Sequence, residues 1–545
     1  MVLGHNSPTL PTIYDVIIVG AGPCGLAVAA RLREKTPSAL FTDEEHQRYH
    51  WINRHAGKAA IKSRKTGKVR LGQSDFEDSP SMLVLDSSGD SWMSQWDRLF
   101  DELQITHLRS PMFFHVSPDD RDGLQAYMHE QGRECECIEI AGCVGKEISK
   151  HQAKKKRKKR DGYQPARAVV AIDERDRKDY FAPPSDAFRD YCTFVAERYG
   201  LLEDGLVRQA EVQDIDYDIV PAVDTQKSIF IVRAGGEQFY ARSVVLAVGA
   251  GNKPSIPAPF PESGCDCACH VFRSLDETLP PRISQKRGAR ILVIGGGLTS
   301  AQVVDRALKQ GASKVWHIMR GPMKVKPFDV DLSWMGKFKN HEKASFWSAD
   351  TDEERAELVK TARGGGSITP RYQKILQQHQ SSNKLSIHCN VKVLEQRWDE
   401  KKELWSIQTE PPIEDLPQFD YIYFATGVQS DIEKLDFMQT MLAKHKIESF
   451  NGVPTLTDDL MWKSDVPLFV TGKFASLRLG PGAGNLEGAR TGAERIAWAL
   501  EDVLRGPDYI AEQRSHVAEP DMLEQKMFRY QAGLGSRFES LTVES

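Results

Sequence analysis

One stretch near the start of the chain limits the possible folds more than any other. Residues 15–43 begin with a β-branched run of strand length and continue through a glycine turn into an apolar helix. They end with a second apolar run, Ala39 to Thr42, that stops at Asp43. This order of strand, turn, helix, strand and acid predicts a βαβ unit that binds a dinucleotide. The turn contains three glycines and one proline: Gly20, Gly22, Pro23 and Gly25.

Each part of this unit has a physical task. Gly20 allows the tight turn, Gly22 lets the backbone approach a pyrophosphate, and Gly25 allows close packing of helix on strand. The helix N-terminus offers free N–H groups and the positive end of its dipole to the anion. Asp43 follows Gly20 by 23 residues. At that distance a carboxylate is expected to accept hydrogen bonds from the ribose hydroxyls.

A second unit of the same kind begins at residue 289. Ser300 replaces the third glycine, and its side chain is small enough for helix and strand to pack closely. The strand over 314–319 ends in Arg320 where the first unit has an acid, and Lys324 and Lys326 follow. A base at this position is typical of sites that accept the 2′-phosphate of NADP, so we expect NADPH rather than NADH. The expected contacts are Gly295, Gly297, Thr299, Ser300 and Arg320.

Apolar strands that end in glycine recur along the chain. One ends in Gly249, one in Gly427, and the strand over 467–471 runs into a third glycine. Two units of one design, each opened by a glycine turn and closed by such a strand, predict an α/β fold with two Rossmann-like dinucleotide-binding domains. We expect the second domain to be inserted into the first. The expected parts are residues 1–285 and 425–503 for the first domain, 286–424 for the second, and a C-terminal tail over 504–545.

Composition bounds the class of protein. The 545 residues are too many for one core, and a net charge of −4 gives no general attraction to nucleic acid. Nine cysteines in this length suit a reducing compartment, and we expect a cytoplasmic protein without a membrane span. The basic run at 154–160 is read as an exposed insertion, either a solvated loop or a nuclear-localisation tract.

Five motifs together resemble a known family: VGAGPCGLAVAARL, LRSP at 108–111, GGGLTSAQ at 295–302, FATG at 424–427 and LGPGAGNLEGAR at 479–490. They are similar to flavoproteins with two dinucleotide-binding domains. Within these, the chain resembles flavin-dependent monooxygenases of the ornithine/lysine N-hydroxylase type and the oxidative-stress-induced growth inhibitor proteins. The resemblance covers about residues 13–500.

The resemblance implies the cofactors and the reaction. The first unit would bind FAD and the second NADPH, and the reduced flavin would react with O2 to form a C4a-(hydro)peroxyflavin. The substrate would be a small nucleophile oxygenated at nitrogen or sulfur. A glycine-rich turn that opens a helix can direct N–H groups at a flavin. We therefore expect cofactor contacts at Asn485 and Leu486, with Arg109 as a further contact or an ordinary surface arginine, and His115 as a pocket candidate.

Departures from the family pattern keep other functions open. Lys473 stands where many flavoproteins carry an aspartate, and no catalytic set of side chains is evident. An NADPH-dependent flavoprotein reductase is one alternative, although the disulfide-reducing kind needs two nearby cysteines, usually CxxC or a similar spacing, and the chain has no CxxC. A redox-sensing regulator with a retained nucleotide fold is another. Cys265, Cys267 and Cys269 are closely spaced, but zinc sites usually have wider pairs, so we expect no metal.

Overall fold

The structure is a computed structural model of the chain. It describes residues 11–35, 37, 39–40, 61–62, 69–70, 79–144, 174–221, 227–251, 253–260, 267–272, 283, 286, 288–335 and 339–516. Asp43, Cys265, the basic run at 154–160 and residues 517–545 lie outside this part.

The first glycine turn follows a central strand of a mixed eight-stranded sheet. Its main path runs β22-β23-β10-β1-β4-β7, with β9 also paired to β10 and β8 paired to β9. The strands β1, β4, β7, β10 and β23 are parallel, whereas β8, β9 and β22 are antiparallel to their neighbours. The bounds are β1 Ile13–Val19, β4 Met82–Asp86, β7 Val207–Gln209, β8 Val212–Ile219, β9 Ser228–Ala234, β10 Glu237–Leu246, β22 Met461–Lys463 and β23 Val466–Val470.

Helices cover this sheet and bury its central strands. Residues 16–18 of β1 are fully buried, as a parallel strand covered on both faces requires. Helix α1 packs along α14, where Arg31 and Glu494 form a partly buried ion pair at 2.6 Å. The helices of this part are α1 Pro23–Arg33, α3 Ser94–Glu102, α4 Gly123–Glu130, α6 Ser185–Arg198, α12 Gln439–Lys444, α13 Ser476–Leu479 and α14 Leu486–His516.

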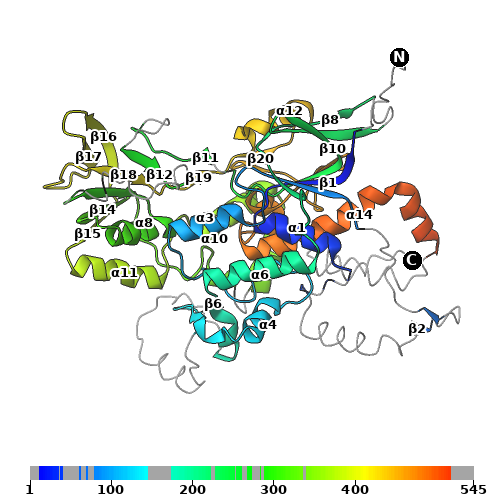
Figure 1. Ribbon diagram of the computed structural model, residues 1–545, viewed down its shortest axis with the longest axis horizontal. Coiled ribbons are helices and arrows are strands. Elements are labelled where there is room, and N and C mark those ends of the chain that lie inside the picture. The colour runs from blue at the N-terminus through cyan, green and yellow to red at the C-terminus, as the bar shows by residue number, and fades with distance from the viewer. Residues whose placement is uncertain are drawn as a thin grey trace, which may run out of the picture.

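A second sheet is built entirely from parallel strands. Its order is β12-β18-β13-β14-β15, with bounds β12 Ala268–His270, β13 Arg290–Ile294, β14 Lys314–Met319, β15 Leu385–Cys389 and β18 Tyr421–Phe424. All five strands lie in sequence between β10 and β23 of the first sheet. Figure 1 shows the two sheets towards opposite ends of the long axis. The helices α8 Leu298–Lys309 and α11 Pro370–Ser381 pack on the second sheet. The helices α9 Lys339–Trp347 and α10 Asp352–Arg363 lie instead towards α13 and α14, with ion pairs from Lys343 to Glu487 and from Asp352 to Arg478.

Small two-stranded pairs complete the described part. They are β2 Ile61–Lys62 with β3 Val69–Arg70, β5 Ile138–Glu139 with β6 Phe181–Ala182, β11 Lys253–Pro254 with β19 Val428–Gln429, β16 Lys392–Asp399 with β17 Leu404–Glu410, and β20 Ser449–Phe450 with β21 Val453–Pro454. The β11–β19 pair joins the segment that leaves the first sheet to the segment that returns to it. The two crossings of the chain therefore lie side by side.

Three local expectations differ from the structure. Ala39 and Leu40, expected to begin a strand, lie in a turn. The strand β12 brings residues 268–270 into the second sheet, so its segment starts earlier than 286. Helix α14 continues to His516 rather than giving way to a tail at 504, although a Gly-Pro pair inside it would favour an end.

Candidate functional site

The first glycine turn is closed by the strand next to it. Gly20 has φ +107, and a Cβ there would lie 2.5 Å from the carbonyl oxygen of Ala247, so no side chain fits. A Cβ on Gly25 would lie 2.0 Å from the carbonyl oxygen of Gly20. Gly22 caps α1, and around a Cβ there no atom of the described residues lies within 4 Å. This turn therefore leaves the helix N-terminus open to an anion at Gly22.

The second glycine turn repeats this construction. Gly295 has φ +152, and a Cβ there would lie 2.2 Å from the carbonyl oxygen of Ala425. Ala247 donates from its N–H to Val19, and Ala425 donates in the same way to Ile294, both at 2.8 Å. These contacts explain why residues 247–249 and residues 425–427 share the pattern Ala-x-Gly. The strand that ends there forms one wall of each turn.

The same comparison identifies the second strand of the first unit. The N–H of Gly295 donates to Ile318 on β14, and the N–H of Gly20 donates to Leu85 on β4. Strand β4 is therefore the counterpart of β14, and it ends in Asp86. The carboxylate of Asp86 accepts hydrogen bonds at 2.7 Å from the N–H groups of Ala21 and Ser88. An acid that ends this strand lies at the edge of the first turn, where sequence reasoning had placed Asp43.

Ser300 has the role expected of a third glycine. Its side chain is fully buried, and its hydroxyl donates to the carbonyl of Gly297 at 2.7 Å. Thr299 lies one residue before it in the first turn of α8. His317 on β14 was not predicted, and its Nε2 lies 2.7 Å from the carbonyl oxygen of Gly295. Burial lowers the pKa of His317 to about 4, so the neutral ring donates this hydrogen bond.

The basic residues after β14 have different surroundings. Arg320 is exposed at the end of the strand. Lys324 donates to the carbonyl of Gly364 at 2.5 Å, and Lys326 donates to the carbonyl of Arg363 at 3.1 Å. Lys326 also forms an ion pair of 2.6 Å with Asp331. Both lysines therefore contact other parts of the chain, and only Arg320 keeps the position expected of a 2′-phosphate ligand.

Arg109 links the segment between α3 and α4 to the segment between β14 and β15. Its guanidinium donates to the carbonyls of Lys326, Pro327 and Ser367, and to the hydroxyl of Ser367 at 2.9 Å. Burial lowers the pKa of Arg109 to about 10. Arg109 was expected either to hold a cofactor or to lie on the surface. In the structure it is half-buried and hydrogen-bonded to the segment between β14 and β15.

A group of charged side chains lies where α14 begins. Asn485 donates to Asp329 at 3.0 Å, and Arg363 forms an ion pair of 2.7 Å with the same carboxylate. Lys473 donates to the hydroxyl of Ser430 at 2.7 Å, and burial together with Arg363 lowers its pKa. The glycine-rich turn before α14 ends at Asn485, and the next residue, Leu486, is buried. The turn thus brings Asn485 next to the charged side chains of Asp329 and Arg363.

His115 is packed in the interior rather than in an open pocket. Its Nδ1 accepts from the N–H of Ser117 at 3.2 Å, and its Nε2 lies 2.9 Å from the carbonyl oxygen of Arg121 and 3.0 Å from the guanidinium of Arg490. Burial and the charge of Arg490 hold its pKa well below the usual value. The structure therefore gives His115 a packing role.

Two further predicted glycines, Gly249 and Gly427, lie one beside each glycine turn. Gly249 and Gly427 have φ of +62 and +81 and follow the two walls formed by Ala247 and Ala425. Cys24 lies against Gly472, and burial raises its pKa to about 11, so the thiol is packed and protonated. In the described part of the chain, no cluster of three His, Cys, Asp or Glu side chains could hold a metal ion.

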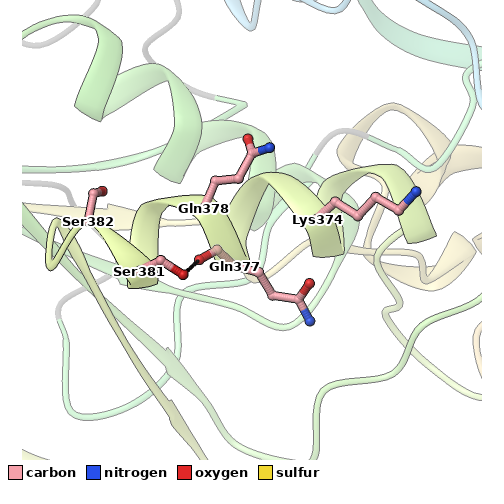
Figure 2. A pocket seen from close by; sticks show the side chains of 5 residues that line it. All are labelled: Lys374, Gln377, Gln378, Ser381 and Ser382. Atoms are coloured by element: carbon pink, nitrogen blue, oxygen red, sulfur yellow. Dashed lines mark hydrogen bonds between the residues drawn. The ribbon is translucent and has the colours of Figure 1, made fainter.

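A surface hollow on α11 has no part in this site. Figure 2 shows that it is lined by polar side chains of α11 and the residue that caps it: Lys374, Gln377, Gln378, Ser381 and Ser382. Because one helix end supplies the whole lining, nothing converges on a ligand from other elements. Among the helices that the structure describes, none is long and apolar enough to cross a membrane.

Comparisons with known proteins agree with the sequence motifs. Residues 177–430 match the family model of L-lysine 6-monooxygenase/L-ornithine 5-monooxygenase. Curated protein sequences gave no match.

Solved structures show the same fold at low identity. An ornithine N-hydroxylase from Kutzneria sp. 744 matches with 15% identity and a TM-score of 0.58, over 90% of this chain and 99% of that one. An ornithine hydroxylase from Pseudomonas aeruginosa matches with 15% identity and a TM-score of 0.58, over 90% and 100%. An L-lysine 6-monooxygenase from Pseudomonas syringae matches with 17% identity and a TM-score of 0.54, over 90% and 100%. The chain is thus similar, as its motifs predicted, to flavin-dependent monooxygenases of the ornithine/lysine N-hydroxylase type.

Proposed function

We propose that the chain is an FAD-dependent monooxygenase that consumes NADPH and oxygenates a small nucleophile, with the nitrogen of an amine as the first candidate. The observation that carries this proposal is the duplicated turn. Gly20 and Gly295 each meet the carbonyl of an Ala-x-Gly strand, and each opens a helix at a parallel sheet. Two such turns in one chain provide for two dinucleotides.

We assign FAD to the first turn. The N-terminus of α1 and Gly22 would hold the pyrophosphate, and Asp86 would accept hydrogen bonds from the adenosine ribose. Arg33 and the other basic residues of α1 lie in its last turn, away from this end. Residues of the return segment, including Gly472 and Asn485, would face the flavin portion. This first domain would comprise the segments that form the eight-stranded sheet.

We assign NADPH to the second turn. The N-terminus of α8, from Gly297 to Ser300, would hold the pyrophosphate, and Arg320 would bind the 2′-phosphate. The second domain would comprise the segments of the five-stranded sheet, from β12 to β18. The β11–β19 pair would mark the place where this domain is inserted into the first.

The protein's own contribution is to bind and orient the two nucleotides and to shelter the reduced flavin from water. The reduced flavin supplies the activation of O2 when it is bound. The chain would hold the two nucleotides by backbone N–H groups and by one acid and one base at the strand ends. Arg109 and Asp329 would fix the two parts relative to one another. A site built in this way needs no nucleophile or paired acids of its own, which agrees with the absence of such a set among the predicted residues.

Product analysis tests this function. FAD-loaded protein would be incubated with NADPH, O2 and L-ornithine or L-lysine, the substrates named for the similar enzymes. We expect a hydroxylated amine in proportion to the NADPH consumed. NADPH consumption that yields only hydrogen peroxide with every amine would favour a reductase. Bound FAD that NADPH does not reduce would favour the regulator.

A further inference from the structure

A short glycine loop lies on the second nucleotide turn. Residues 364–367, called the strap below, follow α10 and contain three successive glycines. A Cβ on Gly366 would lie 3.0 Å from Cα and 3.1 Å from N of Gly297. In the other direction, the atom nearest to a Cβ on Gly297 is Cα of Gly366, at 3.9 Å. The two backbones therefore touch on the side where a Gly297 side chain would project.

That side is the one a pyrophosphate needs. The second glycine of such a turn is a glycine because the phosphates approach its backbone closely. A phosphate oxygen bonded to a backbone N–H lies about 2.9 Å from the nitrogen, and the rest of the group extends beyond it. Gly366 lies within this space. The strap and a pyrophosphate therefore cannot occupy the face of Gly297 together.

The strap is held by side chains that other elements supply. Lys324 donates to the carbonyl of Gly364, and Arg109 donates to the carbonyl and hydroxyl of Ser367. Beyond the strap, Ile368 exchanges backbone hydrogen bonds of 2.9 and 3.0 Å with Lys324 and Lys326. Between these fixed points, Gly364 and Gly365 have φ of +62 and +83, a region that glycine enters without strain.

We propose that the strap is a closure of the NADPH site that withdraws when the nucleotide binds, a proposal that rests on the assignment of NADPH to this turn. Lys324 provides the release. Its ammonium is exposed and bonded to a neutral carbonyl, whereas a phosphate offers a charged acceptor and adds the attraction between opposite charges. The phosphates draw Lys324 away from Gly364, and the strap leaves Gly297 by rotation at Gly364 and Gly365.

Hydrogen exchange on the FAD-loaded protein tests the strap with and without NADP+. We expect the amides of residues 297–301 to exchange more slowly when NADP+ is present, and those of residues 365–367 to exchange faster. Slower exchange in both segments would contradict the proposal, because the loop would then be a wall of the bound site. Unchanged exchange over 365–367, with protection over 297–301, would contradict it as well. No protection over 297–301 would overturn the NADPH assignment itself, and the strap with it.

A substitution gives a second test, because the proposal predicts the direction in which the dissociation constant of NADP+ changes. In Gly366→Ala the new methyl meets Gly297 and disfavours the closed strap, so the open state becomes more populated. We expect the dissociation constant of NADP+, measured by calorimetry, to fall about threefold to tenfold. Gly321→Ala is the control, because nothing described lies within 4 Å of its Cβ, and it should leave the constant unchanged within about twofold. Weaker or unchanged binding in Gly366→Ala would refute the strap. If this variant does not fold, exchange on the unmodified protein decides.

Discussion

The assignment of the ribose acid to Asp86 rather than Asp43 gives the sharpest prediction. In the structure, the carboxylate of Asp86 accepts two backbone hydrogen bonds of 2.7 Å at the first turn. Asp86→Asn keeps one oxygen as an acceptor but removes the charge. Hydrogen bonds to a charged group contribute about 1.5 to 3 kcal/mol, and 1.4 kcal/mol corresponds to tenfold in affinity. We therefore expect FAD to bind about 10- to 100-fold more weakly.

The assay is a titration of the apoprotein with FAD, followed by flavin fluorescence. Asp43→Asn is the matched control, since it makes the same chemical change, and we expect it to alter affinity by no more than about twofold. Thermal unfolding of both apoproteins separates loss of affinity from loss of stability. If Asp43→Asn weakens FAD binding and Asp86→Asn does not, then β4 is not the functional equivalent of β14, and the assignment of Asp86 is wrong.

Three further predictions concern the second turn and the junction. Arg320→Ala should raise the Michaelis constant for NADPH about tenfold or more and leave that for NADH nearly unchanged, because only NADPH carries the 2′-phosphate; equal effects on both would remove Arg320 from the site. His317 titrates near 4 when folded and near 6.5 when unfolded, so the unfolded state takes up the proton first as pH falls. Unfolding free energy should therefore decrease by about 1.4 kcal/mol per pH unit from His317 between these values, and denaturant titrations of His317→Gln should show a smaller decrease; an identical pH dependence would contradict this. Arg109→Met should lower the midpoint of thermal unfolding and slow flavin reduction by NADPH while FAD stays bound, and loss of FAD with normal stability would instead make Arg109 a flavin ligand.

The two glycine turns could be predicted because their signals are local. In each unit the strand, glycines and helix lie within about 20 residues, and their spacing fixes their contacts. The strands around residues 13–19, 290–294 and 314–319 formed where the sequence predicted them. Ser300 is fully buried, as expected of a small residue that lets helix and strand pack closely. The five strands of the second sheet lie in sequence between β10 and β23, the order that an inserted second domain requires.

The acid that we assign to the first unit, Asp86, could not be found in the same way. More than 40 residues separate α1 from β4, so the nearest apolar run that ends in an acid, at Asp43, took its place in the prediction. The parallel pairing of β1 with β4 and the hydrogen bond from Gly20 to Leu85 show which strand lies beside the turn. A signal was present, since residues 82–86 are an apolar run that ends in Asp86. Its distance from the turn concealed it.

Contacts between distant segments account for the other differences. Residues 324 and 326 form backbone hydrogen bonds with Ile368, and this pairing brings the side chains of Lys324 and Lys326 to the carbonyls of Gly364 and Arg363. The charge pattern alone had suggested that both lysines could bind a phosphate. Arg109 lies more than 200 residues from its acceptors, and β12 is only three residues long. Neither carries a periodic signal. His317 could have been suspected, because it is a polar residue at a position of β14 that faces the interior.

Rapid mixing tests the central claim most directly. FAD-loaded protein would be reduced anaerobically with NADPH and then mixed with O2, while flavin absorbance is recorded. We predict rapid reduction, followed by a flavin species that is neither oxidised nor reduced and whose decay depends on an added amine. Reduction followed by direct return to oxidised flavin, with or without amines, would contradict the monooxygenase. Failure of NADPH to reduce the bound flavin would contradict the assignment of both nucleotide sites to one reaction.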